Sequence, residues 1–499
     1  MTIQNMTSSD VAHSNFPTYK QQNCKVQNSV DPPEVTIVNG WTIYNVTSNT
    51  TLYARHAYVD RRWNSQLAWH VRIYAVLIGD AIAGRGTLYC TLFKALNDDV
   101  TTASVADAYV YERSMKEITI RGRLVHRVMI TCRIPELTYP KYVLVTSAAA
   151  CVTPSSEQLL KIKAVDNSPY DERIMGVCVP LAYGHFNDVD AVRLVEWIEI
   201  SKLFGVSEIN IYNVTMTVTE KYQSVLDYYA EQEVVRIHSI PPPIVDWPEL
   251  DLYNVSKLAD LVVLNECMME NMYRYSYVIV LDFDDVIVPR AAPYASYKNV
   301  IESSLVYGQA AGNIASYLVR DVLFYLDLEE TRSMPHYLAT LRHVVRLGNG
   351  QQLTNPKQIT NPRLCVHVYI HYCDQVFTAD DLHKPAYNLA YVSTHLLLVH
   401  HYRKSCKAKW RQGVRHEDLI AAARCRGLRK TIRVRKRHRI DRFMWRYKQR
   451  LVENVQPVLT RFDLLDVTSN MQRNFRLNGT SALRFHLPHY QRKLSEDPV

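Results

Sequence analysis

The stretch Tyr277-Val-Ile-Val-Leu-Asp282-Phe-Asp284-Asp285-Val-Ile-Val-Pro289 joins a short apolar run to three closely spaced carboxylates. The aliphatic and aromatic residues that open it predict a strand with both faces buried, as in a parallel sheet. Open α/β sheets bind their ligands at the carboxyl ends of such strands. Carboxylates crowded at one strand end repel one another, and a cation held between them offsets the repulsion. The stretch therefore predicts a cation site; a solvated acidic turn is the alternative interpretation.

A second polar cluster ends the strand-like run Leu396-Leu-Leu-Val-His400-His401-Tyr402-Arg403. A neutral imidazole is a suitable ligand for a metal that two carboxylates already hold. Arginine pairs well with phosphate oxygens, often through two parallel hydrogen bonds. We therefore predict a metal bound by Asp282, Asp284 and His401, with Arg403 beside a diphosphate. Taken alone, this cluster would indicate only a polar strand end.

Strand and helix patterns alternate from residue 176 onward. The predicted strands are 176–181, 208–213, 234–240 and 277–281, and the predicted helices are 188–204, 220–230 and 256–273. Asp188 is the expected amino-terminal cap of the first helix, and Gly205 its stop signal. A spacing of about 30 residues per strand–helix unit is typical of right-handed parallel βαβ sheets. We expect an α/β fold with a mostly parallel sheet flanked by helices, in which Asp282 follows the fourth strand.

The part of the chain before this region has a different pattern. From residue 35 to 163, short alternating runs such as Trp69–Ile78 and Gly86–Phe93 predict an antiparallel sheet or sandwich. Residues 1–33 are polar and end in two prolines, which predicts a flexible tail. The predicted parts are the tail 1–33, a β-rich amino-terminal domain 34–165, an α/β domain 170–410 and a basic, helical carboxy-terminal extension 411–499.

The net charge of +9 comes from one segment of the chain. Arg424–Arg450 holds thirteen Lys and Arg residues against Asp441 as the single acid. A solvated cationic helix is the simplest interpretation, although an anionic membrane surface would also suit this charge. We do not expect a nucleic-acid partner, because the segment contains no zinc, helix-turn-helix or RNA-binding module. The chain also lacks a Walker loop, a G-x-G-x-x-G after a strand and a G-x-S-x-G.

Signals for the cellular compartment point in two directions. Asn-x-Ser/Thr sequons, more frequent than chance predicts, favour the secretory pathway; they lie at Asn5, Asn45, Asn49, Asn213, Asn254 and Asn478. Residues 1–30 contain neither the apolar core of a signal peptide nor about 20 apolar residues for a membrane anchor. The ten cysteines are irregularly spaced and predict no disulfide pattern.

Another run of potential ligands, Leu364-Cys-Val-His-Val-Tyr-Ile-His-Tyr-Cys373, is interpreted as one strand. Period two places Cys365, His367, His371 and Cys373 on one face of it. Side chains two residues apart on a strand are separated by roughly 7 Å, too far for all of them to bind one ion. We therefore expect histidines packed beneath another layer, with two at most cooperating in a site.

An ordered set of motifs resembles glycosyltransferase family 92, the former domain of unknown function 23. The motifs are Ala54–Arg62, Cys178–Leu181, Leu194–Glu199, Ile209–Asn213, Asn265–Cys267, Val280–Pro289, Lys357–Pro362, His371 and His401–Arg403. The resemblance covers roughly residues 40 to 410. It implies a GT-A nucleotide-diphosphosugar fold behind the β-rich amino-terminal domain. It also implies inverting transfer of a sugar, galactose in characterised relatives, from a UDP-sugar to a glycan or glycoprotein acceptor such as core fucose.

The resemblance also assigns expected roles to residues of this chain. Mn²⁺, or Mg²⁺, is the expected cofactor, and the Golgi membrane is the expected location, although the family's membrane anchor is missing from this sequence. Asp282 and Asp284 match the family's D-x-D, and His401 with Arg403 matches its H-Y-R. Asp282, Asp285, Arg403 and His371 are the expected substrate contacts. Asp285 stands where the family usually has Glu, a side chain longer by one methylene.

The catalytic base and the class of enzyme stay open at this point. An inverting transfer needs a carboxylate that deprotonates the acceptor hydroxyl, and Asp321 and Asp374 are candidates. Asp282-x-Asp284 also fits the first motif of haloacid-dehalogenase-type phosphohydrolases, which use a later acidic pair such as Asp380-Asp381. That fold normally opens with this strand, whereas three strand–helix units precede it here. The remaining alternatives are non-catalytic: a glycosyltransferase-like binding protein, or a nucleic-acid binder that works through the basic segment 424–450.

Overall fold

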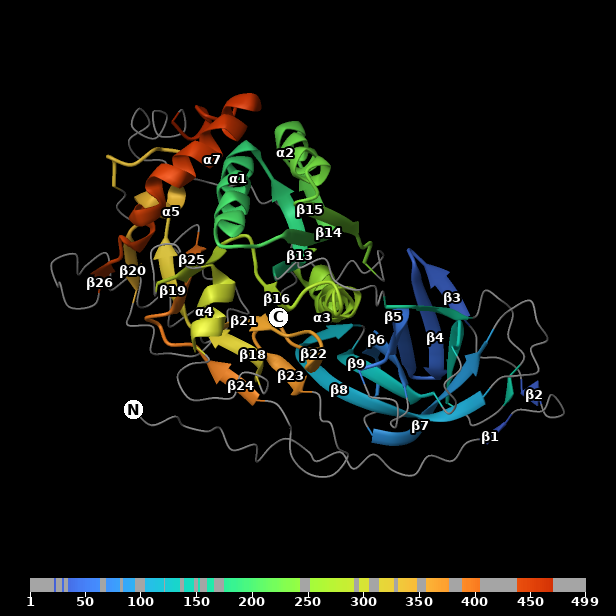
Figure 1. Ribbon diagram of the computed structural model, residues 1–499. Helices are drawn as coiled ribbons and strands as arrows, with labels where there is room; N and C mark the ends of the chain where they lie inside the picture. Colours follow the sequence, from blue (N-terminus) through green and yellow to red (C-terminus); the bar gives the residue numbers. More distant parts are fainter. Residues whose placement is uncertain are drawn as a thin grey trace, which may run out of the picture.

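The computed structural model describes residues 22–23, 29–30, 35–62, 69–80, 84–94, 104–120, 122–134, 139–147, 151–152, 159–165, 175–242, 252–290, 296–304, 314–326, 331–347, 356–376, 388–403 and 438–469. Two groups of sheets lie side by side (Figure 1). Strands from the first third of the chain, blue to cyan, form one group, and the elements from residue 175 onward form the other. Helix α3 (Leu252–Glu270) lies between them. The predicted domain boundaries stay predictions.

The amino-terminal group is a ten-stranded, largely antiparallel sheet. Its strands are β1 (Gln22–Asn23), β3 (Val35–Val38), β4 (Trp41–Thr47), β5 (Thr50–Asp60), β6 (His70–Ile78), β7 (Gly84–Phe93), β8 (Ser104–Ile120), β9 (Arg123–Arg133), β10 (Tyr142–Thr146) and β12 (Leu160–Lys163). Strand β12 pairs with β10 and also with β5, which closes the series β5-β6-β9-β8-β7-β10-β12 into a ring. Two short strands, β2 (Ser29–Val30) and β11 (Cys151–Val152), pair separately.

Alternation along β6 shows how this sheet is buried on both faces. Ile73, Ala75 and Leu77 lie in an apolar core made by strands of the ten-stranded sheet. Tyr74 and Val76 point the other way, into the core that contains α3. The period-two pattern of the sequence therefore marks two buried faces instead of one buried and one solvated. The antiparallel sheet predicted for this region is confirmed.

From residue 175 the chain alternates strand and helix as predicted. The elements are β13 (Met175–Phe186), α1 (Asp188–Leu203), β14 (Glu208–Val218), α2 (Glu220–Glu231), β15 (Val235–Ser239), α3 (Leu252–Glu270) and β16 (Tyr277–Val280). The four strands lie side by side in the order β15-β14-β13-β16, and all of their pairings are parallel. Alternate residues of β16 belong to two cores: Ile279 packs with α1, and Val278 with α3. The fourth strand is thus buried on both faces.

The same sheet becomes mixed beyond β16. It continues through β21 (Lys357–Thr360), β18 (Ile314–Val319) and β24 (Asn388–Tyr391). Strand β21 is antiparallel to both β16 and β18, and β24 is parallel to β18. The mostly parallel sheet of the sequence prediction therefore holds for its first four strands, and the complete sheet is a mixed one.

Local signals position helix α1, although the cap differs from the prediction. Asn187, not Asp188, is the amino-terminal cap: its side-chain oxygen accepts hydrogen bonds from the backbone of Val189 and Asp190. The Asp190 carboxylate accepts one in return from the backbone N–H of Asn187. This capping box satisfies amides that lack partners within the helix. Gly205 follows the helix with φ of 96°, the left-handed conformation that a stop signal requires.

A second mixed sheet carries the polar strand ends. It has the order β17 (Asp285–Pro289), β25 (Leu397–Arg403), β19 (Asp321–Tyr325), β20 (Val345–Leu347) and β26 (His438–Ile440). Strand β17 is antiparallel to β25, and this register places Asp285 opposite His401. Strand β19 is parallel to β25 on its other side. Two short helices, α4 (Tyr297–Ser304) and α5 (Ala339–Arg342), complete this part.

The single strand predicted over residues 364–373 is wrong. The chain forms a hairpin of β22 (Cys365–Val368) and β23 (Cys373–Val376), and the pairing of Val368 with Cys373 closes it. A disulfide joins Cys365 to Cys373, so the two thiols are unavailable as metal ligands. Disulfides also join Cys90 to Cys132 and Cys178 to Cys267.

The carboxy-terminal segment packs onto the second group of sheets. Residues 404–437, with most of the basic run, and the pair Asp380-Asp381 lie outside the described residues. The chain continues through β26, the 3-10 helix η6 (Phe443–Tyr447) and helix α7 (Lys448–Arg461). Leu451, Val455 and Leu459 of α7 are buried in the core that also contains α1. No helix among the described residues is long and apolar enough to cross a membrane.

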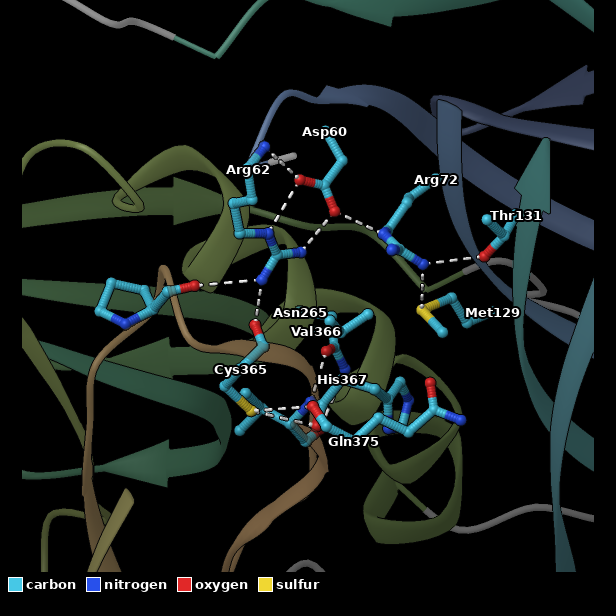
Figure 2. A network of polar contacts seen from close by, with 12 residues as sticks. Asp60, Arg62, Arg72, Met129, Thr131, Asn265, Cys365, Val366, His367 and Gln375 are labelled. Atoms are coloured by element: carbon cyan, nitrogen blue, oxygen red, sulfur yellow. Dashed lines mark hydrogen bonds and ion pairs between the residues drawn. The ribbon is translucent and has the colours of Figure 1, made fainter. Parts of the chain in front are cut away.

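Buried charges join the two groups of sheets, as Figure 2 shows. Arg62, after β5, forms an ion pair with Asp60 and donates to the carbonyl oxygens of Pro362 and Cys365. Arg72 of β6 contacts the other side of Asp60, 2.6 Å from Oδ2. The Asp60 carboxylate therefore holds the Arg62 guanidinium in the position from which it donates to Cys365 of the 365–376 hairpin. Further ion pairs join strands β5 and β9 to α3, namely Arg55–Glu266 and Arg127–Asp260.

Candidate active site

The D-x-D-D of residues 282–285 forms the turn between β16 and β17. Asp282 and Asp284 have side chains that are 43% and 47% exposed, whereas Asp285 is fully buried. The backbone of Asp285 donates to the carbonyl of Asp282, which tightens the turn. Phe283 packs edge-on against Trp197 of α1, and the indole N–H of Trp197 donates to the carbonyl of Asp285. An apolar anchor inside the turn thus leaves two carboxylates facing solvent and one facing inward.

Lys357, the first residue of the family motif Lys357–Pro362, was not among the predicted site residues, yet it lies among these carboxylates. Lys357 opens β21, whose register against β16 pairs Gln358 with Val280 and so places Lys357 just beyond the strand end. Its Nζ is 2.6 Å from Asp282 Oδ2 and 2.8 Å from Asp285 Oδ2, and the side chain is only 5% exposed. Burial alone would lower the pKa of Lys357, but the two carboxylates raise it well above its ordinary value.

His401 joins the other two carboxylates of the turn. Its Nδ1 lies 2.6 Å from Asp285 Oδ1, and its Nε2 lies 3.4 Å from Asp284 Oδ2. The cross-strand pairing of β17 and β25 accounts for this contact. The backbone of Tyr402 donates to the Asp284 carbonyl, and Arg403 Nε donates to His401 Nε2 at 3.2 Å. The predicted H-Y-R stretch therefore meets the D-x-D-D directly.

The charges in this cluster separate the roles of the carboxylates. Burial acts to lower the pKa of His401, but Asp285 and Asp284 outweigh it and raise this pKa to about 9. Burial likewise acts to raise the pKa of Asp285, but Lys357 and His401 hold it well below its ordinary value. The pKa of Asp284 is raised, because of desolvation in the crowded site and because of the neighbouring carboxylates. Asp285 is therefore the firmly ionised member, and Asp284 carries the less compensated charge.

A metal ion would fit one side of this cluster. Ligand atoms of Asp284, Asp285 and His401 all lie within 4.8 Å of one another. Carboxylate oxygens suit Mn²⁺ and Mg²⁺, and imidazole nitrogen suits divalent transition metals. Of the predicted ligands, Asp284 and His401 are brought together, whereas the Oδ2 of Asp282 lies on Lys357. Asp282 as a metal ligand stays a prediction.

The remaining predicted site residues divide between the cluster and another region. Asp321 opens β19 and is half-buried; desolvation raises its pKa, and His401 and Asp285 act on its charge. Asp374 lies instead against the ten-stranded sheet, where it accepts a hydrogen bond from Tyr111 at 2.6 Å. The structure thus places Asp321 beside the cluster and Asp374 at the interface between the two groups of sheets.

His371 reaches the cluster from the turn of the hairpin. Its Nδ1 is 3.1 Å from the carbonyl oxygen of Pro356, the residue before Lys357. Burial and the nearby Lys357 charge lower the pKa of His371 to about 4, so the ring is neutral near pH 7. His371 therefore lies near Lys357 and the D-x-D-D, on a hairpin turn and not on a continuous strand, and its role as a substrate contact stays a prediction.

The polar site of this protein therefore consists of carboxylates and a histidine at adjoining strand ends of two mixed sheets in an α/β fold. The model of glycosyltransferase family 92 matches residues 174–435, which include the complete cluster. The chain belongs to glycosyltransferase family 92, as its motifs indicated. Membership of this family disfavours the phosphohydrolase alternative.

A curated relative gives a more distant likeness. The chain is 24% identical over 167 residues to a protein named β-1,4-galactosyltransferase galt-1 from Caenorhabditis elegans. The match covers 32% of this chain and 37% of the relative, so the chain spans little more than a third of that protein's length.

Proposed function

We propose that this protein is a metal-dependent, inverting glycosyltransferase that moves a sugar from a UDP-sugar to a glycan or glycoprotein acceptor. The carrying observation is the approach of His401 Nε2 to Asp284 Oδ2 at 3.4 Å, at the carboxyl end of β16, in a chain of this family. Galactose is the proposed sugar, because the relative's name describes a galactosyltransferase. We also propose a GT-A arrangement of the four parallel strands.

The metal site in this proposal uses residues that the fold already brings together. Asp284 and His401 would hold Mn²⁺, or Mg²⁺, and the bound ion would supply charge stabilisation for the leaving diphosphate. Asp282, whose Oδ2 lies 2.6 Å from Lys357 Nζ, would contact the nucleotide sugar. Arg403, next to His401, provides a guanidinium for phosphate oxygens. His371 is a neutral contact for the substrate.

Asp321 is the proposed catalytic base. A base must be near the reacting centre and must accept a proton from a sugar hydroxyl, which a raised pKa favours. Two observations support Asp321. It is half-buried with a raised pKa, and it interacts electrostatically with His401 and Asp285 of the cluster. Asp374 is engaged with Tyr111 and His367 away from the D-x-D-D.

We further propose that the protein works in the secretory pathway. The disulfides Cys90–Cys132, Cys178–Cys267 and Cys365–Cys373 form and persist in oxidising compartments. Sequons at Asn45 and Asn49 lie on exposed positions of the ten-stranded sheet, where glycosylation is sterically open. Endoglycosidase treatment of the protein from a eukaryotic secretory host would reveal the added glycans as a loss of mass.

The proposal is tested at Asp284. In a screen of UDP-sugars, Asp284→Ala should lower Mn²⁺-dependent UDP release by about 100-fold or more, because it removes a metal ligand. The fold should stay intact, since the side chain is 47% exposed. Asp374→Asn makes the same change of charge at the interface and should keep release within about threefold of the parent protein.

Two outcomes would contradict parts of this proposal. Turnover that survives Asp284→Ala would show that the metal assignment is wrong. Binding of UDP-sugars by the unaltered protein without transfer to any acceptor would indicate a non-catalytic, glycosyltransferase-like protein. For the base, Asp321→Asn should abolish transfer while UDP-sugar binding persists.

A further inference from the structure

Both carboxylate oxygens of Asp285 face basic groups of the protein. Its Oδ1 lies 2.6 Å from His401 Nδ1, and its Oδ2 forms an ion pair with Lys357 Nζ at 2.8 Å. Its side chain is fully buried, in contrast to the half-exposed Asp284. Although Asp285 is close enough to be grouped with potential metal ligands, its shortest contact is the one to His401. This contact gives Asp285 a direct influence on the His401 ring.

The contacts of Asp285 determine which nitrogen of His401 carries a proton. A metal-binding histidine is neutral, so one ring nitrogen keeps its hydrogen and the other presents a lone pair. An ionised carboxylate only accepts hydrogen bonds, so the nitrogen facing Asp285 must be the donor. In the neutral ring that binds a metal, the lone pair is therefore on Nε2, the nitrogen that faces Asp284.

Lys357 makes this arrangement directional. An ammonium group has three donors and no acceptor, so its ion pair with Oδ2 at 2.8 Å favours an oxygen over an amide NH₂ at that position of residue 285. The lysine cannot turn away, because its side chain is 5% exposed and also pairs with Asp282 at 2.6 Å. The backbone of Asp285 is held as well, through the indole N–H of Trp197. The side chain of residue 285 is thus held between the Lys357 ammonium group and the His401 imidazole.

We propose that Asp285, oriented by Lys357, is a positioning residue that sets the tautomer of His401 and aims its Nε2 at the metal site. The inference rests on the proposed function, in which His401 and Asp284 hold the metal. A carboxylate on the far nitrogen of a ligating imidazole fixes the ring and raises its basicity. Lys357 adds a buried counter-charge that keeps this carboxylate ionised.

The test replaces Asp285 by its amide and measures Mn²⁺ affinity directly. In Asp285→Asn, Lys357 favours the amide oxygen, so the NH₂ group faces His401 Nδ1 and the ring must protonate at Nε2. A ring with a proton on Nε2 offers no lone pair there, and Mn²⁺ should bind about 10–100-fold more weakly. Isothermal titration of the full chain with Mn²⁺ alone measures this, and thermal unfolding verifies the fold.

Glu302→Gln is the control for this measurement. It makes the same change from a carboxylate to an amide at an exposed side chain of α4, in the ion pair with Lys298. Its Mn²⁺ affinity should stay within about threefold of the parent value, because an exposed charge outside the cluster is screened. An equal loss in both variants would show that the effect is not specific to residue 285 and would overturn the tautomer proposal.

A second substitution separates positioning from damage to the fold. In Asp285→Asn with Lys357→Met, the amide is free to rotate and give its oxygen to His401 Nδ1, which restores the Nε2 lone pair. Mn²⁺ affinity should therefore recover relative to Asp285→Asn alone. Lys357→Met alone measures how the loss of the Lys357–Asp282 pair affects Mn²⁺ affinity. The test is the coupling in Mn²⁺ binding free energy between Asp285→Asn and Lys357→Met. Purely additive effects would overturn the inference.

Failure of this inference is distinguishable from failure of the proposed function. If the unaltered protein binds no Mn²⁺, the metal assignment itself is wrong. If the unaltered protein binds Mn²⁺ and Asp285→Asn binds it within threefold, the positioning role is wrong while the metal site stands.

Discussion

Two charged clusters of this protein compensate their carboxylates in opposite ways. In the Asp60 cluster, one fully buried carboxylate lies between Arg62 and Arg72, with nitrogen–oxygen distances of 2.6 Å on both sides. In the D-x-D-D cluster, Asp284 is 47% exposed and its nearest basic atom is His401 Nε2, at 3.4 Å. The first cluster has more cations than carboxylates, and the second has more carboxylates than cations.

This difference separates a structural charge from a functional one. The arginines hold the pKa of Asp60 well below its ordinary value against the effect of burial, so the native state favours the ionised form. Desolvation and the neighbouring carboxylates raise the pKa of Asp284, so the native state disfavours its charge. A buried and fully paired carboxylate joins sheets, whereas the half-exposed and under-compensated Asp284 is a candidate ligand site.

The largest expected effect on stability comes from Asp60→Asn. This change leaves the guanidinium groups of Arg62 and Arg72 buried, with side chains only 2% and 4% exposed, and without their carboxylate. Removal of one partner from such a buried pair costs about 3–5 kcal/mol. Urea unfolding followed by circular dichroism measures the loss. The exposed pair Lys298–Glu302 provides the control, because Glu302→Gln should change stability by less than about 0.5 kcal/mol.

A smaller effect is expected when the Arg62 link to the hairpin is cut. Arg62→Met removes donors to the carbonyls of Pro362 and Cys365 but leaves Arg72 on Asp60. Loss of hydrogen bonds that involve a charged group costs about 1.5–3 kcal/mol. Hydrogen exchange should become faster in residues 365–376. Arg72→Met should leave that hairpin protected, and equal exchange in the two variants would show that Arg62 does not anchor it.

The pH dependence of stability should separate the clusters by about 1 kcal/mol. Because the folded-state pKa of Asp60 is lowered, its contribution is present above the ordinary value of 3.8 and is lost as pH falls below it. At pH 3 the loss is about 1 kcal/mol, since one pH unit corresponds to about 1.4 kcal/mol. Between pH 5 and pH 3, the free energy of unfolding should fall more for the unaltered protein than for Asp60→Asn. Parallel profiles would contradict the role of Asp60.

Sequence patterns were sufficient wherever local chemistry decides the structure. The apolar run of β16, the carboxylates after it and the strand-end cluster at His401 are all recognisable from residue type and spacing. The four parallel strands followed from the alternation of strand and helix patterns. Family motifs then tied these elements to glycosyltransferase family 92.

Features that depend on distant partners were beyond the sequence. Lys357 is an isolated charge at the start of a four-residue strand, and only the tertiary fold shows that two carboxylates surround it. The hairpin at 365–376 turns without glycine or proline. Its closure depends on the Cys365–Cys373 disulfide and on Asn265 of α3, whose amide pairs with the backbone of Val368. A single strand was the local expectation because the period-two pattern does not show where the chain turns, and Asn265 lies 103 residues from Val368.

The smallest effect on stability is expected for Asp284, the half-exposed carboxylate of the D-x-D-D cluster. Asp284→Asn should leave the unfolding free energy of the metal-free protein unchanged within about 1 kcal/mol, or raise it, because it removes repulsion from Asp285 and Asp282. The sign follows from the raised pKa: the contribution of Asp284 is present below 3.8 and is lost as pH rises through its folded-state pKa. Added Mn²⁺ should raise the melting temperature of the unaltered protein and not that of Asp284→Asn, because binding to the native state alone stabilises it. A loss of more than about 2 kcal/mol without metal would place Asp284 with Asp60 among the structural carboxylates.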